Sequence, residues 1–326
     1  MKRWIILGAL LGLGAAIALI VTNNAASVAT MIGAQGWGIL LITLFHFVPL
    51  ILSAAALWVL GKGEGRPWAP FFLGARILRE AVNDLLPAAQ VGGAAASARL
   101  LTQKGWAPTP TLGALFVDVT LESASQVVFV VLGVIVLMID GRAPGIALPA
   151  LVGAGLLAAG VAGFLLLQQA GIIAFVARQI RKFAADFASE GAAEELEAKI
   201  RTLYRDPRAL AASLSLHLVC WIVGTGEVWL ILHFMGAPCS WAEAFILESL
   251  GTAIRSAAFM IPAGLGVQEG GYLLLGTALG FNPSVALALS LTKRVREILI
   301  GVPVLILWQL FEGRRIMRGM SNQSSL

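Results

Sequence analysis

Long apolar segments constrain this chain more than any other sequence feature. Hydrophobic residues make up 58% of its 326 residues and charged residues only 13%, too few to give a soluble globule a polar surface. A helix needs about 20 apolar residues to cross a bilayer. We therefore predict an all-α polytopic membrane protein, a single membrane domain over 1–326, with about six full spans at 4–21, 37–60, 111–139, 146–168, 209–234 and 284–311.

The first apolar run has two interpretations. Residues 4–21 follow Lys2 and Arg3, as expected for either a membrane helix or a secretory signal peptide. The small residues at 25–29 could serve as a cleavage site, which keeps the signal peptide open as an alternative. We favour a membrane helix, followed by an uncharged loop at 22–36.

The positions of the basic residues predict the orientation of the chain. Lys and Arg cluster at the N-terminus, in the loop at 61–70, in the segment 172–208 and in the tail at 313–326. Basic loops stay on the cytoplasmic side of a membrane. We therefore expect both termini in the cytoplasm, and an amphipathic cytoplasmic connector at 172–208. These loops account for the net charge of +5, so we expect no nucleic-acid partner.

Residues 71–101 contain too many polar side chains for an ordinary span, because charged groups that face lipid are costly. We predict a re-entrant hairpin that enters from the cytoplasm, turns near Pro87 and Gly92-Gly93, and returns to the same side. The alternative is an amphipathic pair of helices on the cytoplasmic membrane surface.

A second hairpin is predicted at 241–282. The loop before it should lie outside and the tail inside, so this segment must enter and leave on the outer side. It contains helix-breaking residues in apolar surroundings, namely Pro262, Gly264, Gly266 and Gly270. A broken helix exposes backbone groups that hydrocarbon cannot satisfy, so it should be buried in protein or line a hydrated cavity.

The two predicted hairpins share a pattern. Ionisable residues follow the prolines Pro87 and Pro262 at equal distances: Asp118 and Lys293 at 31 residues, Glu122 and Glu297 at 35. We predict that a first half at 1–168 and a second half at 209–312 form an inverted repeat, the arrangement of many transporters.

The two tips and the helices beside them should enclose a polar cavity near the membrane centre. The residues predicted to line it are Arg79, Glu80, Asn83, Asp84, Gln90, Asp118, Glu122, Glu248, Arg255, Gln268, Glu269, Lys293, Arg294, Arg296 and Glu297. Buried charges must be paired or hydrated, so a structural ion pair is the alternative role for each. We expect neither a metal site nor a cofactor, because two cysteines and three histidines lack metal-ligand spacing.

Two motifs carry a family resemblance. The sequence Pro-Ala-Gly-Leu-Gly-Val-Gln-Glu at 262–269 resembles the Pro-x-Gly-x-Gly-x-x-Glu signature of the transmembrane family named after the lysylphosphatidylglycerol synthase/flippase membrane domain. The sequence at 83–93 looks like the first-half motif of that family, in the version of its hopanoid-biosynthesis-associated branch. One departure concerns substrate choice, because Ala94 stands where many relatives have an acidic residue.

The resemblance implies a bacterial inner-membrane protein that moves an amphiphilic lipid between leaflets, with a hopanoid or another anionic or zwitterionic lipid as cargo. We therefore predict a flippase-like lipid translocator. The alternatives are a membrane-embedded lipid-modifying enzyme and a non-transporting partner of lipid-biosynthesis proteins. No catalytic or nucleotide-binding motif supports the enzyme.

Overall fold

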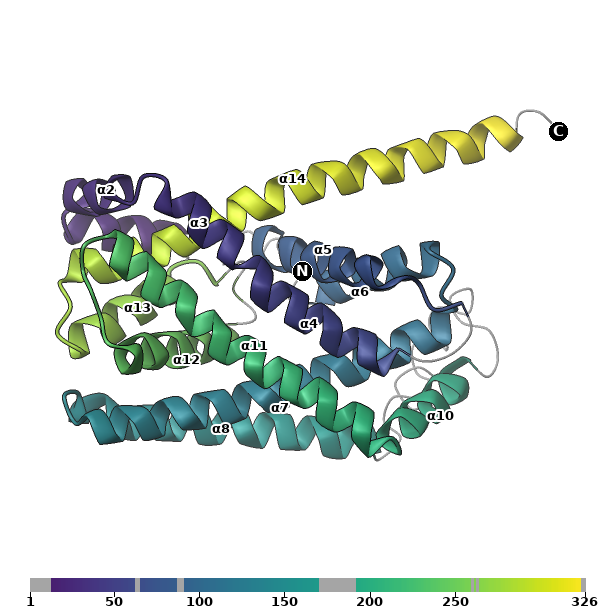
Figure 1. Ribbon diagram of the computed structural model, residues 1–326, viewed down its shortest axis with the longest axis horizontal. Helices are drawn as coiled ribbons and strands as arrows, with labels where there is room; N and C mark the ends of the chain where they lie inside the picture. Colours follow the sequence, from purple (N-terminus) through teal and green to yellow (C-terminus); the bar gives the residue numbers. More distant parts are fainter. Residues whose placement is uncertain are drawn as a thin grey trace.

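The computed structural model describes residues 13–61, 65–86, 91–169, 192–258, 261 and 264–323. Every regular element within these ranges is a helix, which confirms the all-α prediction (Figure 1). The labelled helices are α2 (Ala25–Ala34), α3 (Gly38–Phe45), α4 (Phe47–Leu60), α5 (Ala69–Leu85), α6 (Val91–Gln103), α7 (Pro108–Asp140), α8 (Pro144–Gln169), α10 (Ala192–Tyr204), α11 (Pro207–Phe234), α12 (Trp241–Ala257), α13 (Val267–Ala278) and α14 (Pro283–Gln323).

Four helical segments of the described chain are long and apolar enough to cross a membrane, and a fifth candidate is bent. The four are Gly38–Leu60, which combines α3 and α4, then Pro108–Asp140, Pro144–Leu166 and Pro207–Phe234. Their bounds lie within a few residues of the predicted spans. The polytopic membrane prediction is therefore confirmed.

The predicted loop at 22–36 is wrong. A helix at Leu13–Thr22 meets α2 at an angle of 92°, and α2 fills most of the expected loop. Asn24 adopts a left-handed φ of 65°, and its side chain accepts a hydrogen bond from the Ser27 backbone N–H. Asparagine tolerates this backbone conformation and is a preferred N-cap, so it can end one helix and start the next.

Helices α5 and α6 form an antiparallel helical hairpin. The Ser97 hydroxyl donates to the Ala75 carbonyl at 2.6 Å, and the Gly93 N–H donates to Asn83 Oδ1 at 3.1 Å near the turn. The predicted turn residue Pro87 lies outside the described residues.

Helices α12 and α13 form a second antiparallel hairpin, which packs through glycines. A Cβ at Gly251 would lie 2.9 Å from the Tyr272 ring, and one at Gly271 would lie 2.9 Å from Ile254. Pro262, at the predicted break, lies outside the described residues. Figure 1 shows α12 and α13 in the left half of the molecule and α5 and α6 in the right half. The re-entrant course and the inverted repeat stay predictions.

Helix α14 continues to Gln323, past the predicted end of the last span near 311. The positive-inside rule locates the basic tail but does not end a helix, because helical hydrogen bonds can form on both sides of the membrane surface. Arg99 and Gln103 of α6 contact Glu312 at this end, with Gln103 Nε2 at 3.0 Å. Of the predicted connector, 172–191 lies outside the described residues.

Two apolar clusters pack the two ends of the bundle. One joins the later parts of α7 and α11 to α12 and α13, with Leu137, Ile231, Leu247 and Leu275 among its members. The other joins the end of α4 to α5, α6 and α10, with Leu60, Phe72, Leu101 and Ile200 among its members. Along α7, Asp118 and Glu122 lie between the members of the two clusters.

Candidate functional site

A cavity of about 860 Å³ lies between the two hairpins and is lined by nine helices of the described chain, from α4 to α14. Ten of the predicted cavity residues line it: Arg79, Glu80, Asn83, Asp84, Glu122, Glu248, Arg255, Gln268, Lys293 and Arg296. Among described residues, Asp118, Glu269, Arg294 and Glu297 do not. Gln90 lies outside the described residues.

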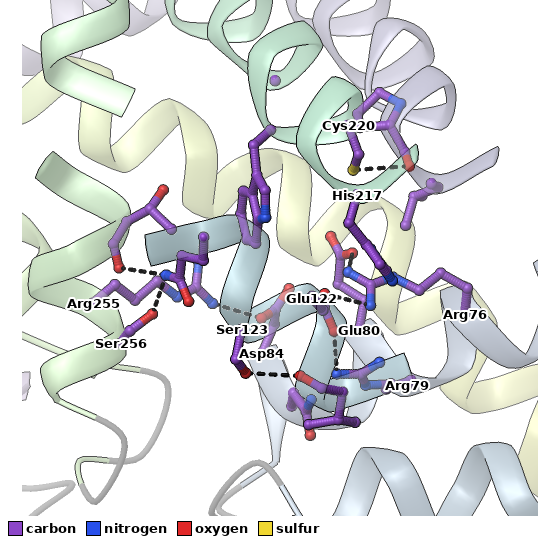
Figure 2. A pocket seen from close by; sticks show the side chains of 18 of the residues that line it. Arg76, Arg79, Glu80, Asp84, Glu122, Ser123, His217, Cys220, Arg255 and Ser256 are labelled. Carbon is purple, nitrogen blue, oxygen red and sulfur yellow. Dashed lines mark hydrogen bonds and ion pairs between the residues drawn. The ribbon is translucent and has the colours of Figure 1, made fainter. Parts of the chain in front are cut away.

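The first group of charges joins α5 to α7 and α11. Arg79 Nη2 donates to Glu122 Oε2 at 2.6 Å, and Arg79 Nη1 lies 3.4 Å from Asp118 Oδ2. Arg76 Nη1 lies 2.8 Å from Glu122 Oε1, and His217 Nε2 lies 2.9 Å from Asp118 Oδ1. Figure 2 shows Arg76, Arg79, Glu122 and His217 on one side of the pocket. Glu122 therefore forms ion pairs with two arginines beside the cavity.

His46 lies between α3 and α4, and its ring contacts side chains of α5, α11 and α14. Its Nδ1 is 2.6 Å from Glu227 Oε2 of α11, and its Nε2 is 2.6 Å from Glu80 Oε1 of α5. Arg296 of α14 contacts both glutamates, at 3.3 Å and 3.2 Å. This junction ties the first hairpin to helices of both halves.

The two hairpins meet through an ion pair close to their turns. Arg255 Nη2 of α12 donates to Asp84 Oδ1 of α5 at 2.5 Å, and Figure 2 shows both side chains at the pocket. Arg255 Nη1 also donates to Glu297 Oε1 of α14 at 2.7 Å. The described ends of α5 and α12 are thus in direct contact.

Glu269 caps its own helix. Its Oε2 accepts a hydrogen bond from the Gly266 N–H at 2.7 Å, and Arg294 Nε donates to its Oε1 at 3.1 Å. Arg294 also donates to Glu297 at 3.2 Å. Both oxygens of Glu269 are therefore used away from the cavity.

A further pair joins the second hairpin to α14. Lys293 Nζ donates to Glu248 Oε2 at 2.5 Å, and the Tyr272 hydroxyl donates to the same oxygen at 3.3 Å. Together these groups form a belt of buried and partly buried charges. It contains eight carboxylates, Glu80, Asp84, Asp118, Glu122, Glu227, Glu248, Glu269 and Glu297, and six fixed cations, Arg76, Arg79, Arg255, Lys293, Arg294 and Arg296. Such pairing offsets much of the cost of removing each charge from water.

The predicted helix-break glycines have different roles. Gly264 and Gly266 have φ of 59° and 77°, which L residues rarely adopt. A Cβ at Gly93 would lie 2.4 Å from Arg79 O, whereas one at Gly270 would meet only Leu19 at 3.8 Å. Gly92 lies at the start of α6.

A second wall of the cavity is apolar and comes from α7 and α8. It contains Leu112, Leu115, Phe116, Val119, Leu157, Val161 and Phe164. The rings of Phe116 and Phe164 lie 5.6 Å apart. Most of α8 faces outward, since only 6% of its apolar segment is buried. The cavity is thus amphipathic, with a charged side and an oily side.

Sequence reasoning missed the charged or imidazole side chains of His46, Arg76, His217 and Glu227, which line the cavity, and also several neutral polar side chains of α7, α12 and α13. A signal was present for three of them, because His46, His217 and Glu227 are ionisable groups within apolar spans, and such groups are expensive in lipid. The described residues contain no group of three or more histidine, cysteine or acidic side chains that could hold a metal ion.

Comparisons with known proteins gave one match. The sequence profile of the family described as the lysylphosphatidylglycerol synthase TM region matches residues 5–304. Neither the search of curated proteins nor that of solved structures gave a match.

Proposed function

This chain belongs to the lysylphosphatidylglycerol synthase TM region family, and we propose that it moves an amphiphilic lipid between the leaflets of a bacterial inner membrane. The observation that carries the proposal is the amphipathic cavity between the two hairpins. A polar headgroup needs hydrogen-bonding groups to replace water, whereas acyl or ring-shaped tails need an apolar path. This cavity provides both hydrogen-bonding groups and an apolar surface.

The charged side suits a headgroup because its pairs can exchange partners. Arg79 and Arg76 share Glu122, so a phosphate could replace this carboxylate as their acceptor without leaving either guanidinium alone. Glu122 or Glu80 would then meet a hydroxyl or an ammonium. The apolar wall of α7 and α8 would hold the start of the tails.

The ion pair between the two hairpins gives the protein a way to change which leaflet the cavity opens to. Arg255 joins Asp84 of the first hairpin to Glu297 of α14, so movement of the hairpins apart must break or remake this contact. Alternating opening toward each leaflet would follow if both termini are cytoplasmic and the hairpins enter from opposite sides. A hopanoid cargo rests on the resemblance of the motif at 83–93.

Reconstitution tests the proposal. The protein is placed in vesicles with a trace of fluorescent lipid, and a membrane-impermeant quencher reports the outer-leaflet fraction over time. We expect exchange faster than in protein-free vesicles, and a loss of about tenfold or more in Glu122→Gln, because the arginines lose their charged acceptor. Arg142→Gln, in the turn between α7 and α8, is the control.

Two outcomes would contradict the proposal. One is exchange no faster than in empty vesicles for every headgroup tried, including lipids that copurify with the protein. The other is a covalent change in the lipid, seen by mass spectrometry, which would favour a lipid-modifying enzyme.

A further inference from the structure

The part of the cavity beside the second hairpin differs chemically from the charged part beside the first. Neutral polar side chains line it, namely Gln126 of α7, Thr252 and Ser256 of α12, and Gln268 and Tyr272 of α13. Within each hairpin helix the two residues are four positions apart, so they lie on one face. Three helices thus present hydroxyl and amide groups to one region.

Gln268 holds a hydrogen-bond acceptor that the protein leaves unused. The residue is only 2% exposed, and its Nε2 donates to Ser290 Oγ at 3.3 Å. Its Oε1 is buried and has no hydrogen-bond partner among the described residues. Buried polar groups are nearly always paired, and an unpaired one is costly. Since Gln268 lines the cavity, a bound molecule can supply the missing donor.

The neighbouring groups favour a hydroxyl over an ammonium as that donor. Lys293 lies above the Tyr272 ring at 5.7 Å and already pairs with Glu248, so a second cation would be repelled. Ser256 Oγ accepts a hydrogen bond from Gln126 Nε2 at 2.6 Å, and its own hydrogen is not committed to any described residue. Hydroxyl groups of a bound molecule can donate to Gln268 and accept from Ser256, whereas an ammonium cannot accept.

We propose that this region is a subsite for the neutral, polyhydroxylated part of a lipid headgroup, such as glycerol or a sugar, with Gln268 Oε1 as acceptor and Ser256 as donor. The inference rests on the proposed function, because it assumes that a lipid headgroup enters the cavity. Phosphate on the same lipid would lie toward Arg76 and Arg79.

The test compares lipids with and without a hydroxylated headgroup. Phosphatidylglycerol and phosphatidylpropanol carry the same charge and a three-carbon headgroup but differ in two hydroxyls. Monoglucosyl diacylglycerol and diacylglycerol differ in the whole sugar and form the second pair. Binding to the purified protein in detergent is measured by native mass spectrometry, and exchange is measured in vesicles. We expect the hydroxylated lipid of at least one pair to bind about tenfold more tightly, and the responding pair identifies the headgroup as glycerol or sugar.

The variant Gln268→Met keeps the side-chain length but removes the acceptor, and we expect it to lose this preference. Gln35 is a matched control, because its Nε2 donates to Thr292 Oγ1 at 2.7 Å and its Oε1 is also buried and unpaired. Among the described residues that line the cavity, Gln35 is absent. Gln35→Met should therefore keep the preference.

The outcomes separate this inference from the proposed function. Equal binding within both lipid pairs by the unaltered protein overturns the subsite, even if every lipid is exchanged. A preference that survives Gln268→Met overturns the role of Gln268. A preference in binding without any exchange supports the subsite and contradicts translocation. Because the first comparison needs no variant, a poorly folded mutant does not affect it.

Discussion

The two helical hairpins have similar outlines but use their charges differently. The first hairpin carries all its cavity-lining charges on α5, and these pair with α7, α14 and the junction at His46. The second hairpin presents Glu248 and Arg255 on α12, while its α13 carboxylate, Glu269, caps a helix. One hairpin therefore brings a dense ionic surface to the cavity, and the other brings mainly neutral polar groups.

The same difference separates two positions that the predicted repeat treats as equivalent. Glu122 and Glu297 both follow the hairpin proline by 35 residues, yet Glu122 lines the cavity and Glu297 lies behind it, held by Arg255 and Arg294. Equal spacing can place two residues at the same depth, but it does not decide which face of a helix they occupy. Repeat symmetry is thus a guide to position rather than to role.

The largest expected effect on stability comes from a comparison of Glu297 with Glu122. Glu297→Ala removes a 3% exposed carboxylate that accepts from two arginines, and we expect a loss of about 3–5 kcal/mol in the free energy of unfolding. Glu122→Ala should cost clearly less, because its side chain is 13% exposed and water in the cavity can hydrate the arginines left behind. Denaturant unfolding in detergent, followed by tryptophan fluorescence, measures both.

The ion pair of Arg99 with Glu312 gives a reference value for the unfolding free energy lost at an exposed site. Arg99→Ala removes a side chain that is 59% exposed and should change the unfolding free energy by about 1 kcal/mol or less. Equal losses in Glu297→Ala and Glu122→Ala would contradict the assignment of one glutamate to structure and the other to the cavity.

A double-mutant cycle tests the contact between the hairpins. Asp84→Asn and Arg255→Gln each remove one charge of the pair, and the double variant should be less destabilised than the sum of the two, by about 1–3 kcal/mol. Unfolding free energies of the three variants give this coupling. Additive losses would mean that the two hairpin ends do not touch in the protein in detergent.

Much of the fold could be predicted because a bilayer sets both the length and the apolar character of its spans. The spans predicted at 111–139 and 209–234 differ from α7 and α11 by at most three residues at each end. The helix α2 was missed because it is short, and because lack of charge says nothing about whether a connection is helical. Its start depends on the local cap at Asn24.

The candidate site was predictable in its composition but not in its pairing. Costly charges in apolar segments indicated a buried polar network, and ten of the named residues line the cavity. The sequence could not show that Glu269 turns toward Gly266 or that His46 joins Glu80 to Glu227. The first contact depends on which way one side chain turns at a helix start, and the second on partners more than thirty residues away. Hydropathy records neither.

A pair of glycine substitutions compares the turns of the two hairpins. Gly93→Ala would bring a Cβ to 2.4 Å from the Arg79 carbonyl, and we expect a loss of about 1–3 kcal/mol. Gly270→Ala should be tolerated, because the added methyl group would be 3.8 Å from its nearest neighbour. Thermal unfolding of both variants checks this, and equal melting temperatures would show that the first hairpin can open without cost at its turn.

The smallest expected effect concerns Glu269, which the sequence placed in the cavity. Glu269→Gln keeps a carbonyl oxygen for the Gly266 N–H but loses the charge opposite Arg294, so the free energy of unfolding should fall by about 1 kcal/mol. Its rate of lipid exchange should equal that of the unaltered protein, whereas Glu122→Gln should lose most of its exchange. A loss of exchange in Glu269→Gln at unchanged stability would assign the charged part of the headgroup to α13 and remove the contrast between the hairpins.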